Sequence, residues 1–392
     1  MMQHWSEDHI RFMLDAAEFG TFYPQLVQRI LPLLPQGGSI CDAGCGLGHL
    51  AVALSPYFSS VTACDRAKAP LQNLKHRAPQ NLTILHGDIS TVPPALPYDG
   101  MVFCFFGQPE EILSVAERQC GGEVVVIQRA SRHHRFAAKN TPPHRQYDRE
   151  LSDLLQERNI PYGIQHLSLE FGQPFRSQTE ALRFFHLYGQ GNPLSEGEIL
   201  SRLVPIADHP EFCLYLPQSR DITITTFRLP KKRHLFLTGE KQVGKSTLLR
   251  RLTERITAPG GFLTVRKPQA NGNFAVHMLH PRMDTCCDDN LLFICGGSID
   301  PRRFDELGCQ YLSESRFAPA LIMDELGRKE ENAITFQETV LRALDGDIPV
   351  YGVLQKADSA FLRRIAAHPA VFVVEVTKEN RDRLYDELKK KW

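Results

Sequence analysis

The chain has 392 residues, which is too long for one ordinary hydrophobic core and predicts roughly two to three domains. Hydrophobic residues make up 42% of it and charged residues 23%, as in a folded globular protein rather than a disordered one. The formal net charge is zero, so no overall field draws the chain to nucleic acid or to an anionic membrane. We therefore expect no strong nucleic-acid binding.

Membrane and metal signals are also weak. No apolar run approaches the ~20 residues that span a bilayer, and the N-terminal stretch lacks the basic-then-apolar order of a signal peptide. The ten cysteines are scattered without paired zinc-binding knuckles, which indicates free thiols and a cytoplasmic location. His133 and His134 stand in a locally basic stretch, 129–150. No carboxylate or cysteine lies at ligand spacing beside them, so we expect no metal there.

The first 130 residues alternate between helical and strand patterns. The expected elements are a helical segment (4–34), a strand, glycine turn and helix (39–54), a strand (60–65), a helix (70–77), a strand (81–89), a strand (98–107), a helix (110–116) and a strand (122–129). Strands and helices at this spacing predict a parallel, doubly wound α/β sheet, whose strand ends converge on one crevice.

A further strand, a helix and two more strands complete this half of the chain. The helix is expected to begin near Ser177, with Glu180 completing a capping box. Residues 211–217 and 221–230 alternate around a polar turn and are predicted to pair as an antiparallel hairpin. We therefore place the first domain at residues 1–229, with a short polar linker beginning at Pro230.

The glycine turn reads D-A-G-C-G-L-G over residues 42–48. Its glycines are Gly44, Gly46 and Gly48, and Asp42 precedes the first by two residues. A bare glycine-rich turn after a strand is weak evidence, because a dinucleotide-binding Rossmann domain has one too. In this form the turn resembles motif I of the class I S-adenosylmethionine-dependent methyltransferases.

That resemblance implies cofactor contacts by the turn and by three acids. The close backbone of Gly44, Gly46 and Gly48 would admit the amino acid end of the cofactor. Asp42 would lie near the methionine portion of S-adenosylmethionine, Asp65 would bind the ribose, and Asp88 would approach the adenine amino group. A NAD-binding domain, or a fold that has lost its ligand, stays as the alternative. Phe105 to Pro109 stand where some families carry N-P-P-Y, and Cys104 lies inside a strand, so the methyl acceptor is not identified.

The firmest motif is LFLTGEKQVGKSTLLRRL, residues 235–252. A β-prone run, the spacing G-x-x-x-x-G-K-S and an amphipathic helix follow one another, as a phosphate-binding loop requires. Backbone N–H groups of such a loop and the helix N-terminus surround phosphates, the lysine reaches the outer phosphates, and the serine hydroxyl binds Mg²⁺. The expected nucleotide-binding residues are Gly239, Glu240, Lys241, Gln242, Val243, Gly244, Lys245, Ser246 and Thr247.

The remaining C-terminal pattern predicts a second α/β domain, residues 230–392. Expected strands cover 260–267, a following strand paired with it as a hairpin, LLFICGG, 318–327, PVYGVLQ and AVFVVEVT, with helices between them. The strand 318–327 is apolar and ends in Asp324 and Glu325. We expect Asp324 to hold Mg²⁺ together with Ser246, and Glu325 to orient or deprotonate an attacking water.

This half is similar to the small nucleoside triphosphatases called the cancer-related nucleoside triphosphatase family. The matching pieces are GEKQVGKSTL, GGFLT, DELGRKE and TKENRDRL. The resemblance implies slow hydrolysis of ATP, GTP and other nucleoside triphosphates, with Lys245 and Glu325 as catalytic residues. It also aligns Glu330 with a family acid, and Asn380 and Arg381 with a pattern near the base. The region 280–290 departs from the family. Arginines that could stabilise transition-state charge are Arg266, Arg302 and Arg328.

Together these patterns predict a bifunctional enzyme that hydrolyses nucleoside triphosphates with Mg²⁺ and binds S-adenosylmethionine for methyl transfer. Two alternatives stay open. A P-loop kinase would pass the phosphate to a small acceptor, and a regulatory switch would use nucleotide state to control a degenerate methyltransferase domain or a partner.

Overall fold

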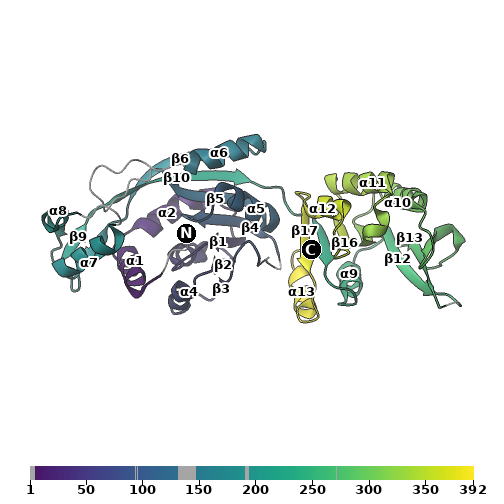
Figure 1. Cartoon of the computed structure of the whole chain (residues 1–392), viewed down its shortest axis with the longest axis horizontal. Coiled ribbons are helices and arrows are strands. Elements are labelled where there is room, and N and C mark those ends of the chain that lie inside the picture. The colour runs from purple at the N-terminus through teal and green to yellow at the C-terminus, as the bar shows by residue number, and fades with distance from the viewer. Residues whose placement is uncertain (1–4, 93, 95, 131–146, 190–193, 271) are drawn as a thin grey trace. The chain divides into compact units, whose positions relative to one another are not determined.

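The computed structural model describes residues 5–92, 94, 96–130, 147–189, 194–270 and 272–392. The chain divides into two compact units, one of residues 1–92 and 98–229 and the other of residues 93–97 and 230–392. Each unit is an α/β structure built on its own seven-stranded sheet (Figure 1), which confirms the predicted fold class. His133 and His134 lie outside the described residues.

The sheet of the first unit has the strand order β3-β2-β1-β4-β5-β10-β6. Neighbours from β3 to β5 are parallel, whereas β10 is antiparallel to both β5 and β6. The strands are β1 (Ser39–Ala43), β2 (Ser60–Asp65), β3 (Leu82–His86), β4 (Tyr98–Cys104), β5 (Cys120–Arg129), β6 (Tyr162–Glu170) and β10 (Ser219–Arg228). The chain reverses its crossover direction between β1 and β4. In sheets of this kind ligands bind at that point, beside the carboxyl ends of the strands.

Helices cover both faces of this sheet because its central strands are apolar on both sides. Ile40 of β1 packs on one face with residues of α2, α3 and α4, and Cys41 packs on the other face with residues of α5 and α6. The helices are α1 (Glu7–Phe19), α2 (Phe22–Ile30), η1 (Leu31–Leu33), α3 (His49–Leu54), η2 (Ser55–Tyr57), α4 (Lys68–Lys75), α5 (Pro109–Gln119), α6 (Tyr147–Glu157), α7 (Gln178–Tyr188) and α8 (Glu196–Ser201).

The predicted hairpin of residues 211–217 and 221–230 is wrong. Residues 219–228 form β10 of the main sheet, whereas β9 (Leu214–Leu216) pairs with β7 (Gln173–Phe175) and β8 (Val204–Pro205) in a separate three-stranded sheet. Phe175 and Leu216 of this small sheet pack with α7 and with Phe12 of α1. Burial in that second core outweighs the local turn signal. The predicted start of α7 is confirmed, since the Ser177 hydroxyl accepts the Glu180 N–H.

The sheet of the second unit has the order β14-β13-β12-β15-β16-β11-β17. Strands from β12 to β17 in this order run parallel, and β12 turns back antiparallel into β13 as the predicted hairpin. The strands are β11 (His234–Thr238), β12 (Gly260–Pro268), β13 (Phe274–Leu279), β14 (Leu291–Ile294), β15 (Leu321–Leu326), β16 (Val350–Leu354) and β17 (Val371–Glu375). Strand β16 therefore separates the strand before the phosphate-binding loop from the strand that ends in Asp324.

Successive side chains along these strands point to opposite faces of the sheet, and each face has its own hydrophobic core. Phe236 of β11 packs with α10, α11 and α12 on one face, and Leu235 packs with α9 and α13 on the other. The helices are α9 (Lys245–Thr253), η3 (Asp288–Asn290), α10 (Pro301–Glu314), η4 (Arg328–Glu330), α11 (Ile334–Asp345), α12 (Ala360–Ala366) and α13 (Arg381–Leu388).

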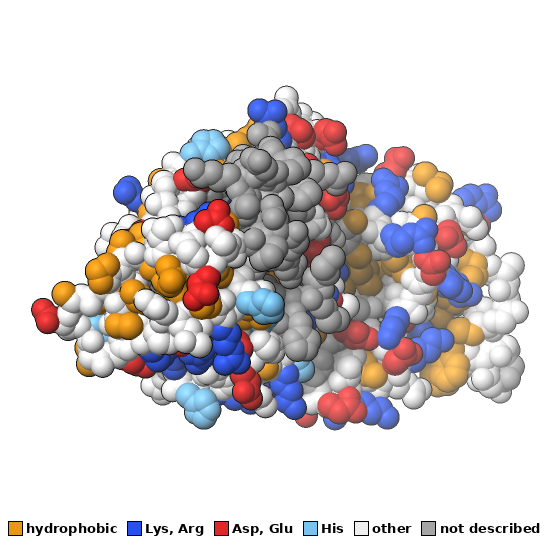
Figure 2. Space-filling view, turned by 60° about the vertical axis from the view of Figure 1, so that its left-hand side comes forward, with side chains coloured by type: hydrophobic (Ala, Val, Ile, Leu, Met, Phe, Trp, Pro, Cys, Tyr) orange, Lys and Arg blue, Asp and Glu red, His pale blue; other side chains and the backbone are white. Residues whose placement is uncertain are grey.

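The described surface mixes charges of both signs. Figure 2 shows Lys and Arg side chains lying among Asp and Glu side chains over much of one face, in keeping with the zero net charge. Among the described residues, no helix combines the length and apolarity that crossing a membrane requires.

Candidate functional sites

The glycine turn of the first unit is a tight left-handed loop between β1 and α3. Gly44, Gly46 and Gly48 have φ of +71°, +53° and +71°, a backbone region that side chains other than glycine rarely adopt. A Cβ at Gly44 would lie 2.1 Å from the Phe106 side chain, and one at Gly48 would lie 2.5 Å from Leu74. The turn therefore requires glycine at all three positions, and close packing against protein side chains adds to that requirement at Gly44 and Gly48.

Asp42 is the most unusual group near this loop. Asp42 is the next-to-last residue of β1 and is 1% exposed. Neither oxygen of its carboxylate makes a hydrogen bond of normal geometry within the described part of the chain. Burial, together with the nearby charge of Asp65, raises the pKa of Asp42 to about 7, which the backbone of Ala51 only partly offsets. A buried carboxylate without a partner is costly. The arrangement therefore fits a ligand that brings a cation or a donor to this position.

Asp65 and Asp88 lie at the ends of the two next strands. The Asp65 carboxylate accepts the N–H of Gly46 at 2.8 Å and that of Ala67 at 2.7 Å. Asp88 accepts the N–H and the hydroxyl of Ser90 and pairs with Arg66 at 3.3 Å, and these contacts hold its pKa below the usual range. Ionised carboxylates keep further lone pairs, so both can still accept hydrogen bonds from ligand hydroxyl or amino groups.

Phe105 and Phe106 follow β4, and the Phe106 side chain lies against Gly44 of the glycine turn. Phe105 has φ of +56°, a strained value for an aromatic residue. The Arg220 guanidinium of β10 lies 3.8 Å from the ring centroid of Phe171 and 5.5 Å from that of Phe105. Such strain persists where the surroundings fix it, and it often marks functional sites.

The phosphate-binding loop of the second unit has the geometry that its sequence predicts. Gly239 has φ of +136°, and a Cβ there would lie 2.3 Å from the Val376 carbonyl oxygen. Gly244 has φ of +100° and is the N-cap of α9. The Lys245 ammonium donates to the carbonyl oxygens of Gly239 at 2.8 Å and Glu240 at 2.7 Å. Burial lowers the pKa of Lys245. The lysine is thus folded back onto the backbone carbonyls of its own loop.

Ser246 and Asp324 meet at this loop although 78 residues separate them. The Ser246 hydroxyl donates to a carboxylate oxygen of Asp324 at 3.2 Å, and the Thr264 hydroxyl donates to the Asp324 backbone carbonyl at 2.7 Å. Burial raises the pKa of Asp324 to about 6. Hydroxyl and carboxylate oxygens are donors that Mg²⁺ accepts, and Mg²⁺ usually takes only one or two protein ligands beside phosphate oxygens. The pair fits that ion.

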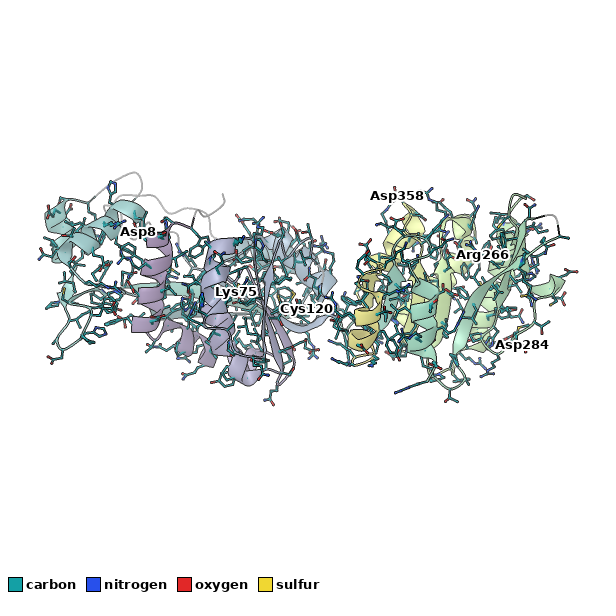
Figure 3. The ribbon with its side chains drawn as sticks, turned by 90° about the horizontal axis from the view of Figure 1, so that it is seen from below. Asp8, Lys75, Cys120, Arg266, Asp284 and Asp358 are labelled. Carbon is teal, nitrogen blue, oxygen red and sulfur yellow. The ribbon has the colours of Figure 1, made fainter. Side chains whose placement is uncertain are left out.

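Glu325 sits in a strained bend beside the metal-binding pair. The pairing of β15 with β16 shifts register between Met323 and Leu326, and Glu325 has φ of +61°. A bulge of this kind re-aims side chains next to active sites. One Glu325 carboxylate oxygen lies 3.3 Å from the guanidinium of Arg266, which is carried by β12 (Figure 3). Arg266 is therefore the predicted arginine that reaches the acidic pair.

The contacts of the other predicted residues are mainly with the protein's own backbone and side chains. Glu330 is buried, accepts the Gly327 N–H at 2.8 Å and has its pKa raised by burial to about 7. Asn380 closes the turn after β17 by accepting the Thr377 N–H at 2.8 Å. Arg302 pairs with Asp300 at the exposed start of α10.

Two known protein families match the chain, one in each compact unit. The family described as a methyltransferase domain matches residues 40–134, and the family described as NTPase matches residues 234–389. The chain therefore joins a methyltransferase domain to a nucleoside-triphosphatase domain. It is an enzyme of two catalytic domains.

Curated relatives of the second domain are nucleoside-triphosphatases named THEP1. The protein from Thermotoga petrophila is 27% identical over 160 residues, which are 39% of this chain and 89% of that protein. The protein from Methanocaldococcus jannaschii is 25% identical over 166 residues, 39% of this chain and 94% of that protein.

Solved structures resemble each domain. YcgJ from Bacillus subtilis covers 53% of this chain and 98% of its own at a TM-score of 0.36 and 11% identity. THEP1 from Aquifex aeolicus covers 40% of this chain and 96% of its own at a TM-score of 0.33 and 21% identity.

Sequence reasoning missed some residues that shape these sites. Arg77 donates to the Leu47 carbonyl at 2.7 Å and lies 3.2 Å from Nδ1 of the His49 ring. Arg77 therefore stabilises the glycine turn although it lies outside the turn's sequence motif. Thr264, which fixes the Asp324 backbone, lies within GGFLT. Thr264 lies three residues after the double glycine of this segment, and that double glycine was the available signal.

Proposed function

We propose that the second domain, residues 230–392, hydrolyses nucleoside 5'-triphosphates such as ATP and GTP to the diphosphate and phosphate with Mg²⁺. The observation that carries this proposal is the contact of Ser246 with Asp324, which brings the metal-binding oxygens to the phosphate-binding loop. The THEP1 relatives, which match this part of the chain, are named as nucleoside-triphosphatases.

The chain's own groups account for each part of that reaction. Backbone N–H groups of residues 239–247 and the start of α9 hold the phosphates, and Lys245 leaves its two carbonyl partners to bind the outer ones. Ser246 and Asp324 would hold Mg²⁺, which would supply positive charge to offset the negative charge of the phosphates. Glu325 positions a water in line with the γ-phosphorus and accepts its proton. The water oxygen bonds to the γ-phosphorus while the bond from that phosphorus to the β,γ-bridging oxygen breaks, and the diphosphate leaves with the bridging oxygen.

We propose that the first domain, residues 1–229, binds S-adenosylmethionine and transfers its methyl group to an acceptor not yet identified. The observation that carries this proposal is Asp42, a buried carboxylate without a hydrogen-bond partner within the described residues. The ammonium group of the cofactor would supply the missing partner. Asp65 would accept from the ribose hydroxyls and Asp88 from the adenine amino group, using lone pairs that their present contacts leave free.

The ten free cysteines support a cytoplasmic location, where thiols stay reduced.

One pair of assays tests both domains. Release of phosphate from ATP or GTP without any acceptor is expected for a hydrolase. Formation of ADP only when an acceptor is added would instead identify a kinase. In the same preparation, calorimetric titration with S-adenosylmethionine is expected to give one site per chain. Failure to bind it would mean that the first domain has another ligand or none.

A regulatory switch gives a different pattern. Both activities would then be slow, and S-adenosylmethionine would change the rate of triphosphate hydrolysis. Mass spectrometry of small molecules that copurify with the chain is the most direct way to name the ligands of both domains.

A further inference from the structure

A cavity of about 590 Å³ opens beside the phosphate-binding loop of the second unit. We call it the basic cavity. It is lined by Lys241, Ile299, Pro301, Arg328, Lys329, Asn332, Gln355, Lys356 and Ala357. These residues come from the phosphate-binding loop, from the segment that begins α10, and from the loops that follow β15 and β16. The sequence patterns assign no function to most of them.

The fold brings this cavity to the edge of the sheet that carries the phosphate-binding loop. Strand β16 lies between β11 and β15, so the loops after all three strands meet at one edge of the sheet, where α/β proteins bind ligands. The Lys356 ammonium lies 3.2 Å from the Glu240 carboxylate of the phosphate-binding loop. The Arg328 N–H donates to the Gln355 side chain at 3.4 Å. Asn380, which the sequence places near the base, does not line the cavity.

The charge of the lining is one-sided. Four of its side chains are cationic, two are amides, and no carboxylate contributes to it. Lys356 is paired with Glu240 and Glu375, but among the described residues no carboxylate forms an ion pair with Lys241, Arg328 or Lys329. In a chain of zero net charge, such a concentration of unpaired cations favours an anionic ligand.

Most of the cavity lining is not needed to hold the phosphates of a triphosphate. The phosphates of a bound triphosphate are held by the backbone of residues 239–247, by Lys245 and by Ser246, and only Lys241 of that set lines the cavity. Its volume lies within the range of small-molecule sites, roughly 300–1,000 Å³. The apolar side chains of Ile299, Pro301 and Ala357 offer a surface for the non-phosphate part of a ligand.

We propose that the basic cavity binds a phosphate-bearing small molecule while a nucleoside triphosphate occupies the phosphate-binding loop. This inference rests on the proposed triphosphate site. The shared chemistry of the ligand is a phosphate group, which could come from inorganic phosphate or from a phosphate monoester. Lys329 and Arg328 bind the anion, and Gln355 and Asn332 donate further hydrogen bonds to its oxygens.

The test is a calorimetric titration of the full chain. The chain is first saturated with Mg²⁺ and the non-hydrolysable β,γ-imido analogue of ATP, and then titrated with inorganic phosphate or, separately, with ribose 5-phosphate. The same titrations are repeated on the complex with ADP. Lys329→Gln removes one cavity cation. Lys390→Gln removes an exposed lysine of the same unit that does not line the cavity, and it serves as the matched control.

We expect an anion to bind in the presence of the triphosphate analogue, with its Kd raised about three- to tenfold by Lys329→Gln. Lys390→Gln should leave that Kd unchanged, and both variants should bind the analogue as the parent chain does, which also shows that they are folded. Tighter binding of ribose 5-phosphate would identify a phosphate monoester as the source, and binding of phosphate alone would identify inorganic phosphate.

Three outcomes would overturn the proposal. The first is binding of anions to the ADP complex alone, which would place them in the vacated γ-phosphate position. The second is that neither anion binds to the analogue complex. The third is that Lys329→Gln has no more effect on the anion Kd than Lys390→Gln. Failure of the analogue itself to bind would refute the proposed triphosphate site, and with it this inference, and is measured separately in the first step.

Discussion

The proposed binding of S-adenosylmethionine beside the buried Asp42 carboxylate predicts an affinity that depends on pH. Its pKa in the folded chain is about 7, raised from the ordinary value of 3.8 by burial first and by Asp65 second. Below pH 7 the group is therefore mostly neutral, and it gives the cofactor ammonium no opposite charge. Since a nearby cation favours the ionised form, binding lowers the pKa of Asp42 and releases a proton. Affinity is thus expected to rise with pH.

The size of the effect follows from that pKa. At pH 5.5 about 3% of Asp42 is ionised and at pH 7.5 about three quarters, a ratio of about 25. The α-amino group of the cofactor begins to lose its proton near pH 7.7–8.0, which trims the expected gain in affinity to about 15- to 25-fold. Calorimetry at pH 6.5 in two buffers of different ionisation enthalpy should detect release of roughly three quarters of a proton.

The same raised pKa predicts the opposite trend for the free protein. Because folding penalises ionised Asp42, its contribution to stability is complete below the ordinary pKa of 3.8 and is lost as pH rises through about 7. Bound cofactor should cancel that loss.

Asp42→Asn is the decisive variant. It keeps the shape of the side chain but cannot ionise, so it should weaken binding at pH 7.5 by about 1.5–3 kcal/mol and abolish the pH dependence. A Kd for the parent chain that stays flat between pH 5.5 and 7.5 would refute the reasoning. So would a variant that keeps the parent's pH dependence.

Other predictions concern the remaining residues of the two loops. Lys245→Ala should abolish phosphate release but leave the S-adenosylmethionine Kd unchanged; loss of both would contradict independent sites. Glu325→Gln should lower kcat for hydrolysis by about 10²–10⁴-fold with little change in nucleotide Kd, and a kcat near that of the parent chain would exclude Glu325 as the base. Gly44→Ala should destabilise the first unit by about 1–3 kcal/mol more than Gly37→Ala in thermal unfolding. The two glycines have φ of +71° and +69°, but only Gly44 faces Phe106, whereas a Cβ at Gly37 meets no atom within 4 Å. Equal losses would mean that backbone strain alone matters.

The sequence by itself determined both fold classes and the main chemical groups. A phosphate-binding loop and a glycine turn are local features, because their spacing, their flanking strands and their following helices lie within about twenty residues. The roles of Gly239, Gly244 and Ser246 therefore follow from the local pattern alone. The alternation of strand and helix patterns along the chain likewise predicted an α/β sheet in each half.

Only the tertiary structure decided how distant residues combine. It brought Ser246 to Asp324 across 78 positions, bent β15 so that Glu325 adopts φ of +61°, and moved β9 away from its neighbour β10 into a separate sheet. It also left Asp42 buried without a partner among the described residues and gathered the basic cavity from four segments. Burial and the meeting of strand ends depend on which strands become neighbours. That choice is made by the packing of the whole domain, and a local pattern carries no record of it.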